Sequence, residues 1–214
     1  MTHPTPSDSD FWQARYEAGE AHWDKGAAAP PLLEFLENDR VEGRVLVPGC
    51  GSGHDVRALA AQGADVTGMD FAPGAISAAN AQTNPSQTQF VLADFLNLSP
   101  EFFGMFDWIF EHTCFCAIDP KRRPDYIRSC LQALRPGGRI LAIIYINPDH
   151  DDPDHPPFPT SIAELDEWFS PWFETLQEQV PARSYEGREG RELLRVLRRK
   201  EGIKSRQMFE QRSF

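Results

Sequence analysis

Short apolar runs alternate along the chain with longer segments in which apolar residues recur every three or four positions. This alternation of strand-like and helix-like periods is typical of an α/β domain whose strands are joined by helices. The apolar runs predict strands over 45–47, 64–70, 89–94, 106–110 and 139–146. The amphipathic segments predict helices over 11–16, 30–36, 54–62, 73–81 and 124–134. Residues 139–146 are apolar at almost every position, as expected of a central strand that is buried on both faces.

The last third of the chain predicts one more helix and two closing strands. Ser161 and Glu164 have the spacing of a capping box, which places the start of a helix at 161 and its end near 169. Apolar positions over 173–180 and 192–197 predict the strands. Between the central strand and this helix, residues 147–159 contain five prolines and four aspartates. Such a composition predicts a surface loop, and loops after a central strand often carry function.

These elements predict one domain over residues 1–214, built on a doubly wound sheet with helices on both faces. We expect residues 1–9 to be disordered and residues 10–40 to form an N-terminal helical cap. The core of the domain is expected over 44–199, followed by a charged tail over 200–214. The chain shows no internal repeat.

The stretch from Val45 to Asp55 organises the rest of the chain, because it combines a strand, a turn with three glycines and the start of a helix. Gly49, Gly51 and Gly53 carry no Cβ, so a ligand can approach the backbone closely at the N-terminus of that helix. In a doubly wound sheet, ligands bind at the carboxyl ends of the strands. The turn is therefore expected to form one wall of a binding site.

Acidic residues follow the other predicted strands at the same edge of the sheet. Asp70 comes about 20 residues after the glycines, the usual separation for a carboxylate that binds ribose hydroxyls. Asp94 could bind an exocyclic amine while Phe95 packs on a base, and Glu111 follows the next strand. Together these positions predict a nucleoside pocket. Singly, each has a structural alternative, since a glycine turn can merely join a strand to a helix and an aspartate can merely cap one.

The residues around the glycines favour one kind of nucleoside. The Gly49-x-Gly51-x-Gly53 spacing departs from the G-x-G-x-x-G of pyrophosphate binders, and no Lys-Ser/Thr pair is present for a triphosphate. Asp55, at the start of the helix, would repel a phosphate and attract an ammonium or sulfonium group. The pocket therefore suits adenosine with a cationic amino-acid tail, which is S-adenosylmethionine.

Charge and composition exclude several other classes. The chain has 21 Lys+Arg against 32 Asp+Glu, a formal charge of −11, which is the wrong sign for a general nucleic-acid binder. No apolar run reaches the roughly 20 residues that span a bilayer, so no membrane partner is expected. Residues 1–10 are polar and lack the apolar centre of a signal peptide. The four cysteines have no zinc-site spacing, which favours reduced thiols, a cytoplasmic location and, with no evident interface, a monomer.

The motifs resemble those of the class I S-adenosylmethionine-dependent methyltransferases, and more narrowly those of the thiopurine methyltransferase superfamily in its thiol, thiocyanate and halide methyltransferase branch. The resemblance runs from about 11 to about 199. It implies a Rossmann-like sheet of about seven strands, mostly parallel with the last strand antiparallel. The residues that carry it are Phe11-Trp12, Trp23–Gly26, Pro48–Asp55, Asp70, Asp94-Phe95, Phe115–Pro120, Arg123, Leu134–Ile140, His155–Phe158 and the segment that begins at Glu192.

The resemblance also implies roles for individual side chains. Trp12 and Trp23 would cover the cofactor, and Gly49, Gly51, Gly53 and Asp55 would contact its methionine moiety. Asp70 with Phe71 would bind the ribose, and Asp94 with Phe95 would bind the adenine. Glu111 would lie beside the methyl donor. Arg123 matches a position near the acceptor and could hold an anion such as a thiolate or thiocyanate. Its alternative role is that of a solvated arginine at a helix start. The implied reaction is in-line displacement at the sulfonium methyl, with a small-molecule acceptor.

Departures from that branch surround the acceptor. Glu111-His112-Thr113-Cys114 stands where Asp-Tyr-Thr-Phe is expected, and the loop over 147–159 is unusually acidic. His112, or a histidine of that loop, could act as the base of an N- or O-methyltransferase, which is the alternative function. A protein that binds the cofactor without turnover is a third possibility. The stretch 150–155 is expected to be a solvated acidic loop and not a metal site.

Overall fold

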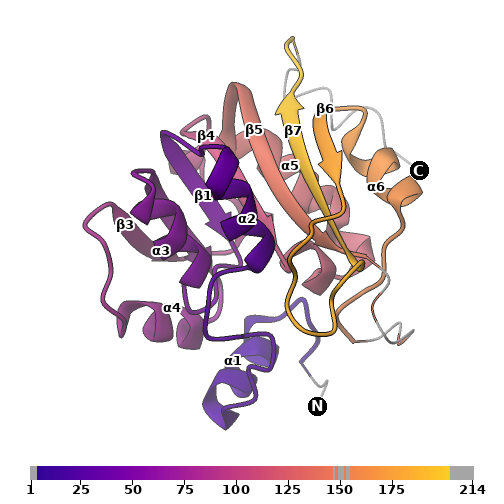
Figure 1. The fold of residues 1–214 in the computed structure, drawn as a ribbon. Helices are drawn as coiled ribbons and strands as arrows, with labels where there is room; N and C mark the ends of the chain where they lie inside the picture. The colour runs from indigo at the N-terminus through magenta and orange to yellow at the C-terminus, as the bar shows by residue number, and fades with distance from the viewer. Residues whose placement is uncertain (1–3, 147, 149–151, 153–154, 203–214) are drawn as a thin grey trace.

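A seven-stranded sheet with the order β3-β2-β1-β4-β5-β7-β6 forms the centre of the computed structural model (Figure 1). The structure describes residues 4–146, 148, 152 and 155–202. β1, β2, β3, β4 and β5 run parallel, whereas β7 is antiparallel to both of its neighbours. The strands are β1 Arg44–Pro48, β2 Asp65–Asp70, β3 Thr88–Leu92, β4 Phe106–His112, β5 Leu134–Tyr145, β6 Phe173–Gln179 and β7 Glu192–Arg199. The predicted Rossmann-like, doubly wound fold is confirmed.

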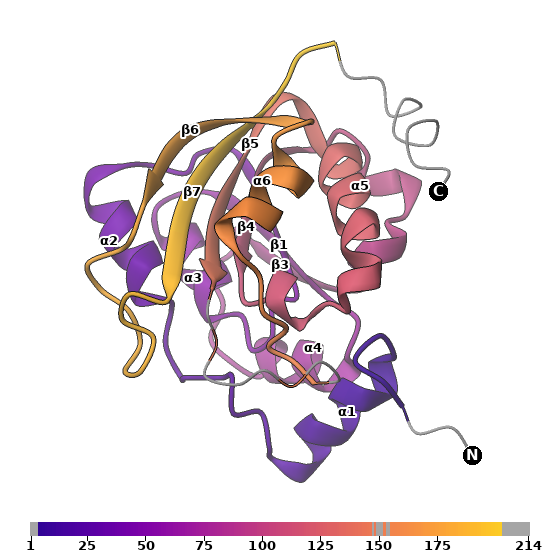
Figure 2. The same cartoon turned by 90° about the vertical axis from the view of Figure 1, so that its right-hand side faces the viewer.

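Helices cover both faces of this sheet. α2 and α3 lie on one face and α5 and α6 on the other (Figure 2). The helices are α1 Ser9–Ala18, α2 Pro30–Asn38, α3 His54–Ala61, α4 Pro73–Asn80, α5 Arg123–Ala133 and α6 Ile162–Phe169. Short 3-10 helices follow the strands at η1 Phe95–Asn97, η2 Pro100–Phe102, η3 Phe115–Ala117 and η4 Pro120–Arg122. The described helices include none long and apolar enough to cross a membrane.

Alternation of side chains explains why β1 is apolar at successive positions. Val45 and Val47 pack into the core beneath α2 and α3, whereas Leu46 packs into the core beneath α5 and α6. All three side chains are buried, so the strand contributes to both layers at once. The register of β1 against β2 then brings Pro48 beside Met69, so both strands end at the same edge of the sheet.

The N-terminal cap lies against that edge. α1 packs on α4 at the carboxyl ends of the parallel strands (Figure 1). The backbone N–H of Gly74 donates to Gln13 Oε1 at 2.7 Å, and a Cβ added to Gly74 would lie 2.5 Å from Tyr16 Cβ. Glycine at this position therefore allows the two helices to meet closely.

Several element boundaries differ from those predicted. Residues 4–8, for which disorder is expected, form a turn in which Thr5 donates to the Asp8 carboxylate before α1 begins. β5 begins at Leu134, so residues 135–138 belong to the strand and not to a separate turn. The capping box is confirmed, since Ser161 and Glu164 exchange the expected bonds. Six of the thirteen residues of the acidic loop, like the tail beyond 202, lie outside the described residues.

Candidate active site

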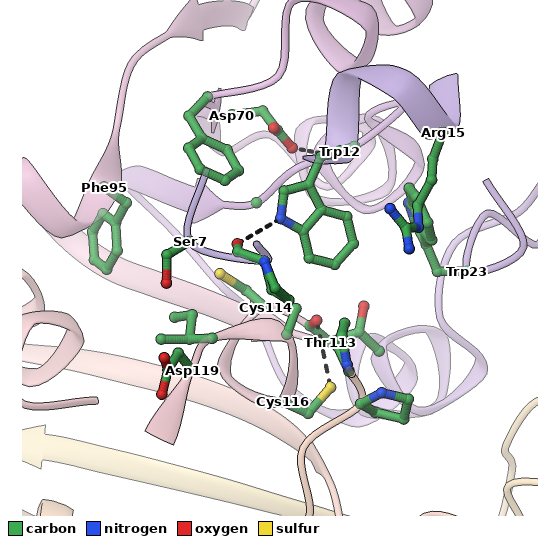
Figure 3. A pocket seen from close by; sticks show the side chains of 18 of the residues that line it. Ser7, Trp12, Arg15, Trp23, Asp70, Phe95, Thr113, Cys114, Cys116 and Asp119 are labelled. Carbon is green, nitrogen blue, oxygen red and sulfur yellow. Dashed lines mark hydrogen bonds between the residues drawn. The ribbon is translucent and has the colours of Figure 1, made fainter. Parts of the chain in front are cut away.

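A cavity of about 440 Å³ lies at the carboxyl ends of the parallel strands, beneath the N-terminal cap (Figure 3). Residues from almost every strand end and from the cap line it. Of the residues predicted for the site, the lining includes Trp12, Trp23, Gly49, Gly51, Asp70, Phe71, Asp94 and Phe95. The other five predicted residues, Gly53, Asp55, Glu111, His112 and Arg123, are not among those that line the cavity.

Asp70 and the glycine turn are held together as one unit. Asp70 Oδ2 accepts from the backbone N–H of Gly51 at 3.0 Å, and Oδ1 accepts from that of Ala72 at 2.9 Å. Burial raises the pKa of Asp70, although these backbone donors oppose the rise. Gly49 and Gly51 have φ values of +60° and +51°, which favour glycine. The turn thus presents backbone, free of side chains, to the cavity.

Aromatic and acidic side chains meet at the next part of the wall. Phe71 follows β2, and Asp94 and Phe95 follow β3. Asp94 Oδ1 accepts from the backbone N–H of Leu96 at 2.8 Å, so this carboxylate caps η1 as well as lining the cavity. The Phe95 ring is fixed from behind by an edge contact with Tyr126, at 5.3 Å between centroids. The two phenylalanines and the carboxylate form a surface suited to a nitrogenous base.

Three aromatic residues of the cap cover the cavity. The rings of Trp12 and Trp23 meet edge to face at 5.1 Å, and Tyr16 meets Trp23 at 5.6 Å. The indole N–H of Trp12 donates to the carbonyl of Pro6 at 2.8 Å, which ties the helix to the segment before it (Figure 3). Aromatic faces of this kind suit a sulfonium through cation–π attraction.

Glu111 lies beneath the cavity floor and not in the cavity. Its Oε1 accepts from the backbone N–H groups of Cys114 and Phe115 at 3.0 and 2.8 Å, and its Oε2 accepts from the Tyr126 hydroxyl at 2.5 Å. Burial raises its pKa, whereas these donors lower it. The carboxylate thereby shapes the segment after β4, in which Thr113 adopts a left-handed φ of 58°. Glu111 supports the site through this segment.

His112 lies on the opposite side of β4, between two carboxylates. Its Nδ1 is 3.2 Å from Asp55 Oδ2, and its Nε2 is 3.7 Å from Glu192 Oε1. Burial lowers the pKa of His112, but the two carboxylates outweigh this effect and raise the pKa to about 9. His112 lies outside the cavity and is protonated at neutral pH, so the geometry does not place it as a base toward an acceptor.

Asp55 and Gly53 are also engaged within the protein. Asp55 Oδ1 accepts from the backbone N–H of Ala29 at 2.7 Å, which anchors the end of the cap loop to α3. Gly53 faces β3, where an added Cβ would lie 2.6 Å from the Phe90 ring. The structure gives these two residues a role in holding the turn and not a place in the cavity wall.

Arg123 begins α5 with its side chain buried, at 2% exposure. Its Nη2 donates to the carbonyls of Phe158 and Pro159 at 3.4 and 3.1 Å, and its guanidinium lies 4.9 Å from the Phe115 ring centroid. These contacts fix the end of the loop that follows β5. The side chain therefore does not reach an acceptor in the cavity, although its neighbour Arg122 does line it.

The sequence reasoning did not identify Arg188, the basic residue at the far end of the cavity. Arg188 lines the cavity together with Tyr145, Cys114 and Cys116. Its guanidinium lies 4.9 Å from the Tyr145 ring centroid. Its position in the sequence could have indicated this, because residues just before an antiparallel strand lie at the same edge of the sheet as the carboxyl ends of the neighbouring parallel strands. Arg188 comes just before β7.

No group of three His, Cys, Asp or Glu side chains within the described ranges could hold a metal ion. The cavity instead combines a bare glycine turn, two strand-end carboxylates and an aromatic cover. On this fold, these features define a class I S-adenosylmethionine-dependent methyltransferase. The family model for thiopurine S-methyltransferase (TPMT) matches residues 7–201, and the chain belongs to this family.

Individual proteins agree with the family model. Thiocyanate methyltransferase 1 of Brassica oleracea is 32% identical over 89% of this chain and 85% of its own length. A 2-heptyl-1-hydroxyquinolin-4(1H)-one methyltransferase of Mycobacteroides abscessus is 31% identical over 81% of this chain and 77% of its own. Among solved structures, the 1,6-didemethyltoxoflavin-N1-methyltransferase of Burkholderia thailandensis, with bound S-adenosylhomocysteine, has the same fold. It superposes with a TM-score of 0.70 at 21% identity, covering 94% of this chain and 92% of its own.

The chain's own residues fit the cofactor of this class. The cavity offers a carboxylate for ribose hydroxyls, aromatic faces for adenine and an open backbone turn for the amino-acid tail, all on one continuous wall. When bound, S-adenosylmethionine supplies an electrophilic methyl group on a sulfonium. Arg188 and Tyr145 line the same cavity.

Proposed function

We propose that this protein transfers the methyl group of S-adenosylmethionine to a small sulfur nucleophile or a comparable soft anion, such as thiocyanate, a thiolate or a halide. The observation that carries the proposal is Arg188, a cavity-lining guanidinium whose one charged partner among the described residues is a distant one. Its Nη1 lies 3.5 Å from Glu192 Oε1, at the limit of a hydrogen bond. Support comes from the family, which is named for S-methylation, and from the relative named for thiocyanate.

The other two arginines of the cavity are less available. Arg15 Nη1 donates to the carbonyl of Phe11 at 2.8 Å, and Arg122 Nε pairs with Asp125 Oδ2 at 2.5 Å. Arg188 lies beside two aromatic rings, those of Tyr145 and Tyr185, which hold a guanidinium without neutralising its charge. An anion in this part of the cavity would meet Arg188 as its counter-ion.

A soft anion needs little chemical assistance from the protein. It is already a nucleophile, so no general base has to remove a proton. The residues of the cavity act by position: Arg188 holds the anion, and the aromatic cover and apolar side chains around it exclude water. The new bond joins the acceptor to the methyl carbon, and the electron pair of the broken bond returns to the donor sulfur.

The proposed cofactor-binding roles follow the order in which the residues line the cavity. Asp70 would accept from the ribose hydroxyls, Phe71 and Phe95 would enclose the adenine, and Asp94 would accept from its exocyclic amine. Gly49 and Gly51 would face the methionine moiety, and Trp12 with Trp23 would close over it. Glu111, His112, Asp55 and Arg123 would act by holding these segments in place.

One feature favours methylation of oxygen or nitrogen as a second candidate function. His155 lines the cavity, and its Nδ1 is 3.0 Å from Asp152 Oδ2. A histidine paired with a carboxylate at the cavity can serve as a general base. The relative named for a hydroxyquinolone is consistent with an acceptor other than a thiol.

A methyl-transfer screen separates these functions. The purified protein is incubated with S-adenosylmethionine and thiocyanate, iodide, bisulfide, a small thiol or a hydroxyquinolone, and S-adenosylhomocysteine is quantified. The proposal expects turnover with the first four classes, and turnover unchanged in His155→Gln. Turnover with the hydroxyquinolone alone, lost in His155→Gln, would support the second function. Calorimetric binding of S-adenosylmethionine without turnover of any acceptor would contradict both.

A further inference from the structure

Behind the cavity wall, four charged side chains form a continuous chain, in which Glu192 is buried and the other three are partly buried. Asp55 Oδ2 is 3.2 Å from His112 Nδ1, and His112 Nε2 is 3.7 Å from Glu192 Oε1. The same Glu192 oxygen is 3.5 Å from Arg188 Nη1. Asp55 begins α3, His112 ends β4 and Glu192 begins β7, so three parts of the fold meet here. Of the four, Arg188 is the one that lines the cavity.

Burial makes the balance of charge in this chain important. The side chain of Glu192 is 0% exposed and that of His112 is 9% exposed. Two carboxylates and two cations offset one another there, and removing one cation would leave a buried carboxylate without its partner. Burial lowers the pKa of His112, but Asp55 and Glu192 together raise it to about 9. The rings of Tyr185 and Phe110 also lie beside the imidazole, and Glu111, on the opposite face of β4, is near enough for a charge interaction with it.

Glu192 shares one oxygen between two cations, and both contacts are long. The two cations repel each other at this shared oxygen, and this repulsion opposes a shorter contact between Arg188 and Glu192. Arg188 therefore stays beside Tyr145 and Tyr185 at the cavity and does not form a close ion pair with Glu192.

We propose that His112 is a positioning residue for the acceptor site, whose imidazolium occupies Glu192 and so keeps the Arg188 guanidinium free to bind an anionic acceptor. The inference rests on the proposed function, because it takes Arg188 as the anion-binding group. Without the imidazolium, Arg188 would be the one remaining cation that the described residues place within 4 Å of Glu192. The guanidinium would move toward β7, and the acceptor would lose its counter-ion.

Thiocyanate is the appropriate probe, because its charge is constant between pH 6 and 10 and any pH effect belongs to the protein. In His112→Gln at pH 7.5, we expect the KM for thiocyanate to rise at least tenfold. The kcat and the calorimetric Kd for S-adenosylmethionine should stay within threefold of wild type. The wild-type KM should rise as the pH passes about 9, whereas the variant should show no such rise. The matched control is His54→Gln. His54 Nε2 lies 3.0 Å from Asp24 Oδ1, and neither residue lines the cavity.

A second variant distinguishes positioning from general loss of structure. Glu192→Gln removes the carboxylate for which the two cations compete, so the double variant His112→Gln/Glu192→Gln should recover a thiocyanate KM within threefold of wild type. Glu192→Gln alone should keep a wild-type KM and lose the alkaline rise. An unchanged KM in His112→Gln, or no recovery in the double variant, would overturn the inference and leave the proposed function standing. Absence of wild-type turnover with every soft anion would instead overturn the proposed function, and this inference with it.

Discussion

The carboxylate of Asp70 accepts a hydrogen bond from the backbone N–H of Gly51, 3.0 Å away, and so joins the end of β2 to the turn that follows β1. One residue thereby shapes the turn and presents an acceptor to the cavity. In Asp70→Asn, we expect the Kd for S-adenosylmethionine to rise at least fivefold, because a charged acceptor for ribose is lost, at a cost of about 1 kcal/mol or more. Isothermal titration calorimetry measures this change.

Asp65 provides the control for that variant, because it begins the same strand at the opposite edge of the sheet and is exposed. Asp65→Asn should bind S-adenosylmethionine as wild type does. Equal affinities in Asp70→Asn and wild type would remove Asp70 from the cofactor site.

Gly74 allows the cap helix α1 to rest on α4. In Gly74→Ala the new methyl group would lie 2.5 Å from Tyr16 Cβ, so α1 must shift away from the cavity. We expect the Kd for S-adenosylmethionine to rise about fivefold or more, while the melting temperature changes by only about 3 °C, since alanine favours the helix itself. Calorimetry and thermal unfolding report the two quantities. The control is Ser77→Ala on the exposed side of α4, and equal weakening in both variants would contradict the role of the close approach.

Arg188→Met tests the proposed anion site, because methionine keeps much of the apolar stem and removes the charge. We expect the KM for thiocyanate to rise roughly 10- to 100-fold, as for a lost charge-assisted contact of about 1.5–3 kcal/mol. Steady-state kinetics with saturating S-adenosylmethionine give the value. Arg122→Met removes a second cavity-lining arginine that is already paired with Asp125, and it should change this KM less than threefold. The reverse ranking of the two variants would transfer the anion site to Arg122.

The stability of the protein should depend on the protonation of His112. Its pKa is about 9 in the folded protein against an ordinary 6.5, so the folded state holds the proton more tightly than the unfolded state. The stabilisation is complete below pH 6.5 and is lost as the pH rises through 9. It amounts to about 3 kcal/mol, since one pKa unit corresponds to about 1.4 kcal/mol. Urea unfolding at pH 6, 8 and 10 should show that the free energies of unfolding of wild type and His112→Gln converge as the pH rises. A difference between the two proteins that stays the same at all three pH values would refute this dependence.

The architecture could be predicted from the sequence because its causes are local. Residues 45–47 are apolar at every position, since β1 is buried on both faces, and the glycines after them mark a turn that other residues cannot readily adopt. Asp70 and Asp94 then fall at strand ends that the fold brings to one edge. Gly49, Gly51, Asp70, Asp94 and Phe95 follow from this pattern, whereas the roles of Trp12, Trp23 and Phe71 are implied by the family resemblance.

The remaining part of the site depends on side-chain direction and on contacts between distant segments. Glu111 and His112 are adjacent, so they point to opposite faces of β4, one toward Tyr126 and the other toward Asp55. Strand-end position alone does not show that both miss the cavity. Arg188 reaches it only through the antiparallel pairing of β5 with β7, which a local pattern does not reveal.

The thiols of Cys114 and Cys116 line the same cavity as the residues assigned to the methyl donor. Burial raises the pKa of both thiols, to about 12 for Cys116, and the nearby charge of Glu111 adds to the rise. At neutral pH both side chains are then thiols and not thiolates, the form that acts as a nucleophile. Under the proposed function, an enzyme that methylates sulfur carries sulfur in its own cavity wall, where its protonated thiols are poor nucleophiles and an anionic acceptor is a good one.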